Sequence, residues 1–563
     1  MSTFRAALAA VSVSGLAILP VAALADTLID NVAGRTIGQN GQIETFTGLV
    51  IDYDGRVKVI LHRDDKRPAK IDYRLDAGGK VLLPGMIDAH VKLMETGFAA
   101  LTLNLSEARS LAEVQDMVRA YAAQHPDRPW IIGYGWNEQR WTGCDGTQQP
   151  ARLPTAADLD AAISNRPVWL VRIDGQAGWA NSAALTAAGV TATSKDPAGG
   201  RIERSAVKAP SGVVIGSARE LVDKVIPAPR PAERDLALRT AQALFLKHGV
   251  TAVTDMGTTI ADWQTYRRAG DNGQLQLRIM AYAAGIEAMS LIAGPAPTRW
   301  LYDDRLRLNG VKFTIDGSLA LRGALLKQPY ADAPNERGME RQSATALRNL
   351  MSRAAMDGFQ IAVGATGDAA NAEALAAISE LAETYKGDRR WRIEHATVVD
   401  PADMANFGAL GVIASVQPQQ QTANLTVTET RLGMSRLGGT YAAPSLVAAG
   451  ARLAFGSDAP TEVPNPFVEM AAALAREVDP AAPEQRLDTA RALAAHTTGA
   501  AFAGLGEDRF GRIAPGLRAD FILVDKDPIN ANANDLRETH VLETWIAGRK
   551  VYENQSPAPV TAP

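Results

Sequence analysis

Residues that can bind a metal ion or move a proton follow short apolar runs at several places along the chain. The five that stand at such places are His90, Lys92, Lys312, His395 and Asp458. Neutral imidazoles and carboxylates suit zinc-like ions, and a bound ion lowers the pKa of a water molecule. A lysine ammonium brings positive charge but has no lone pair for a metal. These residue types are therefore those of a hydrolytic or proton-transfer site.

The runs that must position these residues alternate with Ala-rich stretches of helical spacing. The strand candidates are residues 81–83, 168–171, 251–253, 277–280, 311–314, 360–363, 391–394, 412–416 and 452–455. Strands that alternate with helices predict parallel βαβ units. The fold class that we expect is therefore α/β, a (β/α)8 TIM-type barrel, with the one surplus strand in an insertion. Catalytic groups of such barrels lie at the carboxyl ends of the strands, where the five residues are expected to meet.

The two ends of the chain carry a different, β-rich pattern. Apolar alternations before residue 83 include Asp54-Gly55, a strong hairpin signal, and similar runs return near residues 519–546. We expect residues 26–83 and 505–563 to form one small composite β-sandwich domain, with the barrel at 84–504. An insertion at about 97–225, rich in turns and tryptophans, is expected to lie over the barrel mouth.

The first 25 residues differ from the rest. Arg5, an apolar run and Ala23-Leu24-Ala25 have the parts of a secretory signal peptide at 1–25. A membrane anchor is the alternative, but the run is short for a bilayer span of about 20 residues. We expect a periplasmic or secreted protein with no membrane contact after the signal is removed. Cys144 is the only cysteine, so no intrachain disulfide can form.

The overall charge excludes one class of partner. The net charge is -4 and the pI is about 6.1, without blocks of like charge. Such a chain has no electrostatic footprint for nucleic acid. We expect a small-molecule substrate as the partner, and the oligomeric state stays open.

Several phrases at the expected strand ends resemble the amidohydrolase superfamily. They are Leu83-Pro84-Gly85-Met86-Ile87-Asp88-Ala89-His90, Arg392-Ile393-Glu394-His395-Ala396 and Gly456-Ser457-Asp458-Ala459-Pro460. The tail motif Gly511-Arg512-Ile513-Ala514-Pro515-Gly516 also resembles the β-domain of that family. Within the superfamily the chain is similar to the amidohydrolase-3 branch, including N-substituted formamide deformylases. The resemblance implies hydrolysis of a non-peptide carbon–nitrogen bond, an amide, by a metal-activated water.

The resemblance also implies a ligand set. The family pattern has His-x-His after the first strand, a lysine that is carbamylated in many members, two later histidines and a final aspartate. This chain keeps His90, Lys312, His395 and Asp458 at the matching positions. They imply a divalent metal, zinc by ligand type, with Asp458 as the general base.

Four positions depart from that pattern. Lys92 stands for the second histidine of His-x-His, and Gly364, Gln176 and Gln420 stand where the family has further histidines. The chain has only seven histidines in total. A lysine adds positive charge where a cation should bind, and glycine offers no ligand. The implied metal site is therefore degenerate.

Three functions follow from this conflict. The first is an amide hydrolase with one metal, held by the four retained residues. The second is a catalytically silent barrel that binds a small molecule. The third is a repurposed enzyme without metal, in which the Lys92 ammonium fills the space of the ion and pairs with Asp458 as a catalytic group. A buried carboxylate must be paired or neutralised, which a nearby lysine achieves.

Overall fold

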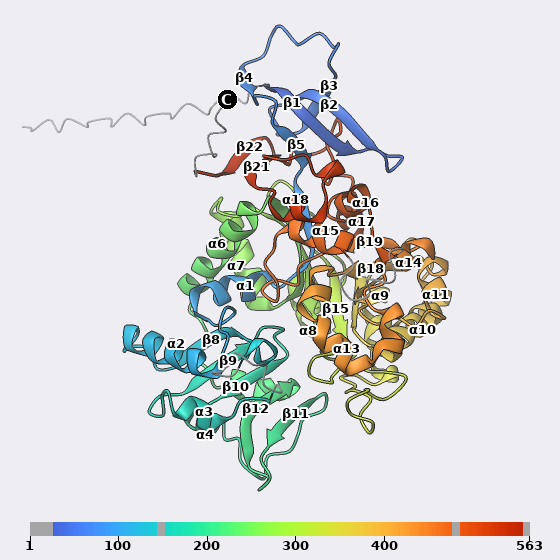
Figure 1. The fold of residues 1–563 in the computed structure, drawn as a ribbon. Coiled ribbons are helices and arrows are strands. Elements are labelled where there is room, and N and C mark those ends of the chain that lie inside the picture. The colour runs from blue at the N-terminus through green and yellow to red at the C-terminus, as the bar shows by residue number, and fades with distance from the viewer. Residues whose placement is uncertain (1–25, 143–151, 476–484, 556–563) are drawn as a thin grey trace, which may run out of the picture.

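The computed structural model describes residues 26–142, 152–475 and 485–555. Three sheets organise this part of the chain (Figure 1). A parallel barrel lies in the middle, and the sheet built from the chain ends and the sheet of the insertion lie on opposite sides of it. The proposed signal peptide, residues 1–25, and Cys144 fall outside the described residues.

The barrel confirms the predicted fold class. Its strands are β6 (Met86–Val91), β13 (Val250–Thr258), β14 (Arg278–Ala284), β15 (Leu306–Thr314), β16 (Gln360–Ala365), β17 (Arg392–His395), β18 (Ile413–Val416) and β19 (Arg452–Phe455). Each strand pairs in parallel with the next. A parallel bridge between Val91 and Ala459 joins the last segment to the first and closes the ring.

Helices pack around the barrel and bury its outer face in one continuous apolar core. They include α1 (Leu93–Leu101), α6 (Pro231–Lys247), α7 (Ile260–Asp271), α8 (Gly285–Ala293), α9 (Ala344–Met356), α10 (Asp368–Thr384), α11 (Met404–Ala409), α14 (Ala443–Ala448), α15 (Pro466–Ala475), α16 (Thr489–Ala495) and α17 (Thr498–Ala503). Local sequence sets their starts: Ser343 caps α9 by accepting from the Ala346 amide, and Thr259 and Asp262 form a capping box on α7.

The prediction for the first barrel strand was wrong. Val81–Pro84 is β5 of the terminal sheet, and the barrel begins after Gly85 with β6. A side chain at Gly85 would meet the Thr251 side chain at 2.3 Å, so the chain passes there only as glycine. The apolar run continues through this passage, and hydrophobicity alone does not separate the two strands. The surplus strand lies in the insertion as predicted, as β9 (Val168–Arg172).

The two chain ends share one sheet, as their β-rich patterns predict. Its order is β22-β21-β20-β5-β1-β2-β3, with β4 paired to β1. The strands are β1 (Thr27–Ile37), β2 (Ile43–Ile51), β3 (Val57–Leu61), β4 (Tyr73–Asp76), β5, β20 (Phe521–Val524), β21 (Val541–Ile546) and β22 (Arg549–Glu553). Antiparallel pairing of β20 with β5 joins the C-terminal strands to the N-terminal ones.

The insertion has a mixed sheet of its own, in the order β11-β12-β10-β9-β8-β7. The strands are β7 (Leu103–Asn104), β8 (Ile131–Trp136), β9, β10 (Ala177–Ala180), β11 (Gly200–Arg204) and β12 (Pro210–Gly216), with α2 (Leu111–Gln124) packed beside them. Trp136 and Trp179 are fully buried and form its apolar core. Among the helices of the described residues, none combines the length and apolarity needed to cross a membrane.

Candidate active site

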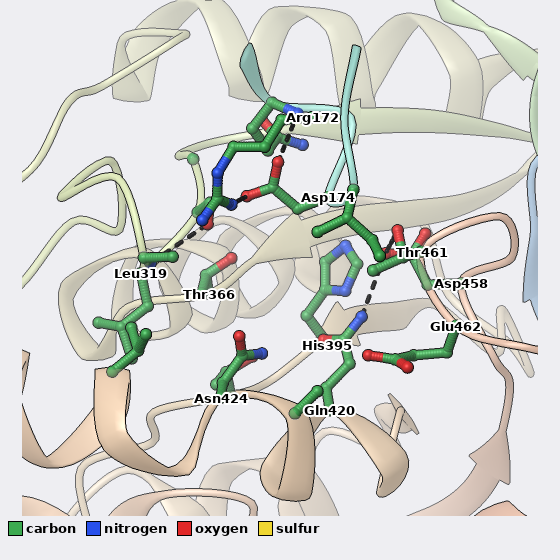
Figure 2. Close-up of a pocket in the computed structure, with 18 of the residues that line it drawn as sticks. Arg172, Asp174, Leu319, Thr366, His395, Gln420, Asn424, Asp458, Thr461 and Glu462 are labelled. Atoms are coloured by element: carbon green, nitrogen blue, oxygen red, sulfur yellow. Dashed lines mark hydrogen bonds and ion pairs between the residues drawn. The ribbon is translucent and has the colours of Figure 1, made fainter. Parts of the chain in front are cut away.

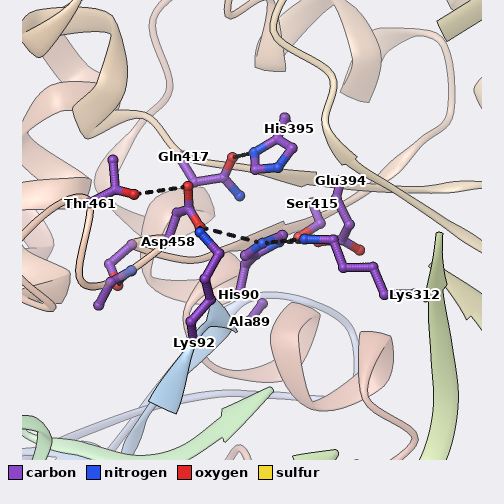
Figure 3. Close-up of polar contacts among 12 residues, drawn as sticks. Ala89, His90, Lys92, Lys312, Glu394, His395, Ser415, Gln417, Asp458 and Thr461 are labelled. Carbon is purple, nitrogen blue, oxygen red and sulfur yellow. Dashed lines mark hydrogen bonds and ion pairs between the residues drawn. The ribbon is translucent and has the colours of Figure 1, made fainter. Parts of the chain in front are cut away.

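The barrel brings the five predicted site residues together at the carboxyl ends of its strands. His90 lies near the end of β6, Lys312 on β15 and His395 at the end of β17. Lys92 precedes α1, and Asp458 follows β19. Figure 3 shows Lys92, Asp458, His90 and Lys312 as one row of polar contacts, with His395 beside it.

His90 is held by a partner on each ring nitrogen. Its Nδ1 donates to the Glu394 carboxylate at 2.6 Å, and its Nε2 lies 3.0 Å from the Lys312 ammonium. Because Nδ1 carries the proton, Nε2 has the lone pair that accepts from Lys312. Burial, with the charge of Lys312, lowers the His90 pKa to about 3. The imidazole is therefore neutral, and its lone pair is already engaged.

The Lys312 ammonium is buried, where a charge is energetically unfavourable. Burial, together with the charge of Lys92, lowers its pKa from 10.5 to about 8. Near pH 7 the group is still mostly protonated, as donation to His90 Nε2 requires. The unmodified Lys312 thus acts as a hydrogen-bond donor in the centre of the site.

Lys92 and Asp458 form the ion pair predicted from the sequence. Nζ of Lys92 lies 3.3 Å from Oδ1 of Asp458, and the carboxylate is nearly buried. Burial disfavours the charge on Asp458, but Lys92 and the nearby histidines hold its pKa below the ordinary value. Burial would likewise lower the Lys92 pKa, but Asp458 and Glu95 raise it. Both groups are therefore charged at neutral pH.

His395 presents to the site a ring nitrogen, Nε2, that has no hydrogen-bond partner among the described residues. Its Nδ1 lies 2.9 Å from Oε1 of Gln417, an acceptor, so the proton is on Nδ1 and Nε2 keeps its lone pair. Burial lowers the His395 pKa, which keeps the ring neutral near pH 7. The backbone of His395 has φ of 73° and that of Asp458 has φ of 55°, both in the left-handed region. Such strain in residues other than glycine concentrates at functional sites.

A pocket opens beside these residues, between the barrel and the insertion (Figure 2). The cavity has a volume of about 100 Å³. Most of the residues that line the cavity have polar side chains. They include Asn137, Arg140, Arg172, Asp174, Gln176, Thr314, Thr366, His395, Gln420, Asn424, Asp458, Thr461 and Glu462.

The four positions that depart from the family pattern all lie close to this site. Gln176 and Gly364 line the pocket. Oε1 of Gln176 accepts from Arg341, and Nε2 of Gln420 donates to Asp458 at 3.3 Å. Lys92 is in the row already described. The substitutions therefore change the chemistry of one place in the molecule.

Sequence reasoning missed two carboxylates of the site. Glu394 is fully buried and accepts from His90 and Arg392, which together hold its pKa below the ordinary value despite burial. Strand alternation could have found it, because residues 392 and 394 share one face of β17. Glu462 lines the pocket four residues after Asp458, and no local pattern in the sequence indicates this.

The residues present do not fit a divalent metal ion. A metal ligand needs a free lone pair, but that of His90 Nε2 accepts from Lys312. Asp458 is paired with the Lys92 ammonium, which would repel a cation. Within 26–142, 152–475 and 485–555, no group of three or more His, Cys, Asp or Glu residues is arranged to hold a metal. The role of the four retained residues as ligands stays a prediction.

A parallel barrel joined to a sheet from both chain ends, with imidazole, lysine and carboxylate groups at its strand ends, defines an amidohydrolase-type protein. The chain belongs to the Amidohydrolase family, whose model matches residues 75–552. The resemblance predicted from the sequence is therefore confirmed at the level of the family. This membership supports a hydrolase that acts on amide bonds.

The chain is also similar to individual proteins. The chain is 33% identical to Protein LONG AFTER FAR-RED 3 of Arabidopsis thaliana, over 84% of this chain and 82% of the relative. It is 26% identical to the N-substituted formamide deformylase of Arthrobacter pascens, over 94% of this chain and 98% of the relative. A solved structure, an uncharacterized metal-dependent hydrolase from Pyrococcus furiosus, is 26% identical with a TM-score of 0.70, and covers 90% of this chain and 100% of its own.

Proposed function

We propose that the protein hydrolyses a non-peptide carbon–nitrogen bond, an amide, of a small molecule without a catalytic metal. The observation that carries the proposal is the double lysine arrangement: Lys92 lies 3.3 Å from Asp458, and Lys312 lies 3.0 Å from His90. Two ammonium groups here supply the positive charge that the family pattern assigns to metal. Family membership supports the amide as the bond that is cleaved.

The residues divide the chemistry among them as follows. His395 takes a proton from water through its free Nε2, and the water oxygen bonds to the amide carbon. The ammonium groups of Lys92 and Lys312 stabilise the negative charge that develops on the carbonyl oxygen. The carbon–nitrogen bond then breaks, and the leaving nitrogen receives the proton from His395. Asp458 holds Lys92 in place and keeps it charged.

A divalent metal is the competing proposal. The likeness to a metal-dependent hydrolase suggests one, and zinc would suit the imidazole and carboxylate donors of His90, His395 and Asp458. Lys312 could join them only as a carbamate. The engaged lone pair of His90 and the Lys92–Asp458 pair argue against this site, and we derive no step through a metal.

A binding protein without catalytic activity is the second candidate. It is favoured by one observation: each charged group of the row is already paired without any ligand. A polar network that satisfies itself is stable without a reaction to perform. In that case the pocket would hold a small molecule unchanged.

One experiment separates these functions. The purified protein is analysed for metals, and turnover of N-formyl and N-acetyl amines is measured with and without a chelator. The proposal expects no stoichiometric metal, turnover that resists the chelator, and its loss in Lys92→Ala. Turnover that the chelator abolishes and zinc restores would establish the metal enzyme. Absence of turnover with every amide would favour the binding protein.

The place of action is also a proposal. The charged, apolar and small-residue parts of residues 1–25 support export, with Ala23-Leu24-Ala25 as the cleavage site. The protein would then act in the periplasm or outside the cell.

A further inference from the structure

One carboxylate of the pocket forms no ion pair with any residue in the described part of the chain. Glu462 lines the cavity, and its Oε2 accepts from Nε2 of Gln419 at 3.0 Å. No lysine, arginine or histidine of the described residues lies within ion-pair distance of it. Arg140 lines the same pocket and its charge acts on Glu462, but the residue is exposed and forms no ion pair with this carboxylate.

The other acidic side chains of the pocket wall have ion-pair or backbone hydrogen-bond partners. Asp174 pairs with Arg172 at 2.5 Å, and Asp458 pairs with Lys92. Asp316 accepts three backbone amides, from Leu325, Thr366 and Gly367, and so holds the loops. Within ranges 26–142, 152–475 and 485–555, Glu462 is thus the pocket carboxylate whose one hydrogen-bond partner is a neutral amide.

Glu462 lies in the segment that follows Asp458, and hydrogen bonds within this segment fix its position. The Thr461 amide donates to the Asp458 carbonyl oxygen at 2.9 Å, and the Thr461 hydroxyl contacts the Asp458 carboxylate at 3.3 Å. Figure 2 shows the Glu462 carboxylate turned into the pocket toward Gln420. A ligand in contact with His395 and Asp458 therefore has Glu462 within the same cavity.

Burial of a carboxylate without an ion-pair partner disfavours its charged form. Burial raises the pKa of Glu462 to about 7. A cationic group in the pocket would remove this cost by forming a charge-assisted hydrogen bond. A neutral ligand of the same shape would leave the carboxylate unpaired.

We propose that Glu462 is a specificity-determining residue that selects small amides carrying a second, positively charged amino group. This inference rests on the proposed function, because it names the substrate class of the same site. The amide would lie at Lys92 and His395, and the ammonium would pair with Glu462.

The test compares amides that differ only in this charge. N-Acetyl-1,3-diaminopropane, N-acetylputrescine and N-acetylcadaverine are each paired with N-butyl-, N-pentyl- or N-hexylacetamide, in which a methyl group replaces the ammonium. Binding is measured by calorimetry on the full-length mature protein, and hydrolysis is measured separately. We expect at least one ammonium compound to bind about tenfold or more tightly than its neutral partner, as one charged hydrogen bond provides.

The variant Glu462→Gln keeps the shape and removes the charge. We expect it to lose the preference for the ammonium compound, so that the two members of each pair bind with similar affinity. Glu429→Gln, on the exposed side of α13 (Leu425–Leu432) near the same pocket, makes the same change in net charge and should keep the preference.

Two results would overturn the inference. One is equal binding of every pair, including no measurable binding of either member. The other is a preference that survives Glu462→Gln. A different result would contradict the proposed function alone. If the protein prefers the ammonium compounds through Glu462 but hydrolyses no amide, the inference about selectivity stands and the protein is a binding protein.

Discussion

The Lys92 ammonium lies 3.3 Å from the Asp458 carboxylate, across the seam that closes the barrel. The backbone binds across the same seam, because the Asp458 amide donates to the His90 carbonyl oxygen at 2.8 Å and the Lys92 amide donates to that of Ala459 at 2.9 Å. Backbone hydrogen bonds and an ion pair thus join the first and last segments of the barrel. A carboxylate that would otherwise be uncompensated is neutralised within the chain.

The first prediction concerns the stability of this seam. Lys92→Met should lower the free energy of unfolding by about 1–3 kcal/mol, since it leaves a buried carboxylate unpaired while some water still reaches the site. Asp458→Asn in the same chain should restore most of the loss. Urea denaturation measures both. Lys58→Met, which removes the exposed partner of Asp26, is the control and should change little. Equal stability of the two lysine variants would contradict the role of Lys92.

The second prediction concerns metal binding. Lys92→His with Gly364→His removes one ammonium and returns two imidazoles to the site. A Cβ at Gly364 would have Thr314 Oγ1 as its nearest neighbour at 3.3 Å, so only a small shift is needed. We expect about one zinc per chain after dialysis in this variant, and none in the wild type or in Lys92→Met. Mass spectrometry of the metal content measures it. Stoichiometric zinc in the wild type would contradict the conclusion that its site does not fit a divalent metal ion.

The sequence predicted the fold and the five site residues because both depend on local patterns. Alternating apolar runs indicate the barrel, and phrases at the strand ends indicate His90 and Asp458. The boundary between β5 and β6 at Gly85 was not predicted, because one continuous apolar run contributes a strand to each of two sheets there. Glu462 could not be predicted for a different reason. Its interest is that it forms no ion pair within the described residues, and only the packing of Gln419 and the insertion around it reveals this.

The third prediction concerns export. The protein, expressed with its own first 25 residues in a Gram-negative host, should be recovered from the periplasm with Asp26 as its first residue. Intact mass and N-terminal sequencing measure the cleavage. Ala23→Asp with Ala25→Asp should block it, because signal peptidase requires small residues there. Full-length wild-type protein that stays in the membrane fraction would instead favour the anchor.

The fourth prediction is a pH dependence set by Lys312, whose pKa is about 8. If its ammonium stabilises the reaction, kcat/KM should fall about tenfold per pH unit above pH 8, as the group loses its proton. Stability should change in the opposite direction. The pKa in the folded state lies below the unfolded value of about 10.5, so between these values the unfolded chain binds more protons and the contribution of Lys312 to stability rises with pH.

A loss of activity above pH 8 would therefore not result from unfolding caused by deprotonation of Lys312. Lys312→Arg keeps the positive charge across the whole range, because a guanidinium does not deprotonate there. If this variant retains measurable activity, its profile should lack the fall above pH 8. The same fall in Lys312→Arg would assign the titration to another group and remove Lys312 from the proposed chemistry. Circular dichroism at each pH confirms that the compared samples are folded.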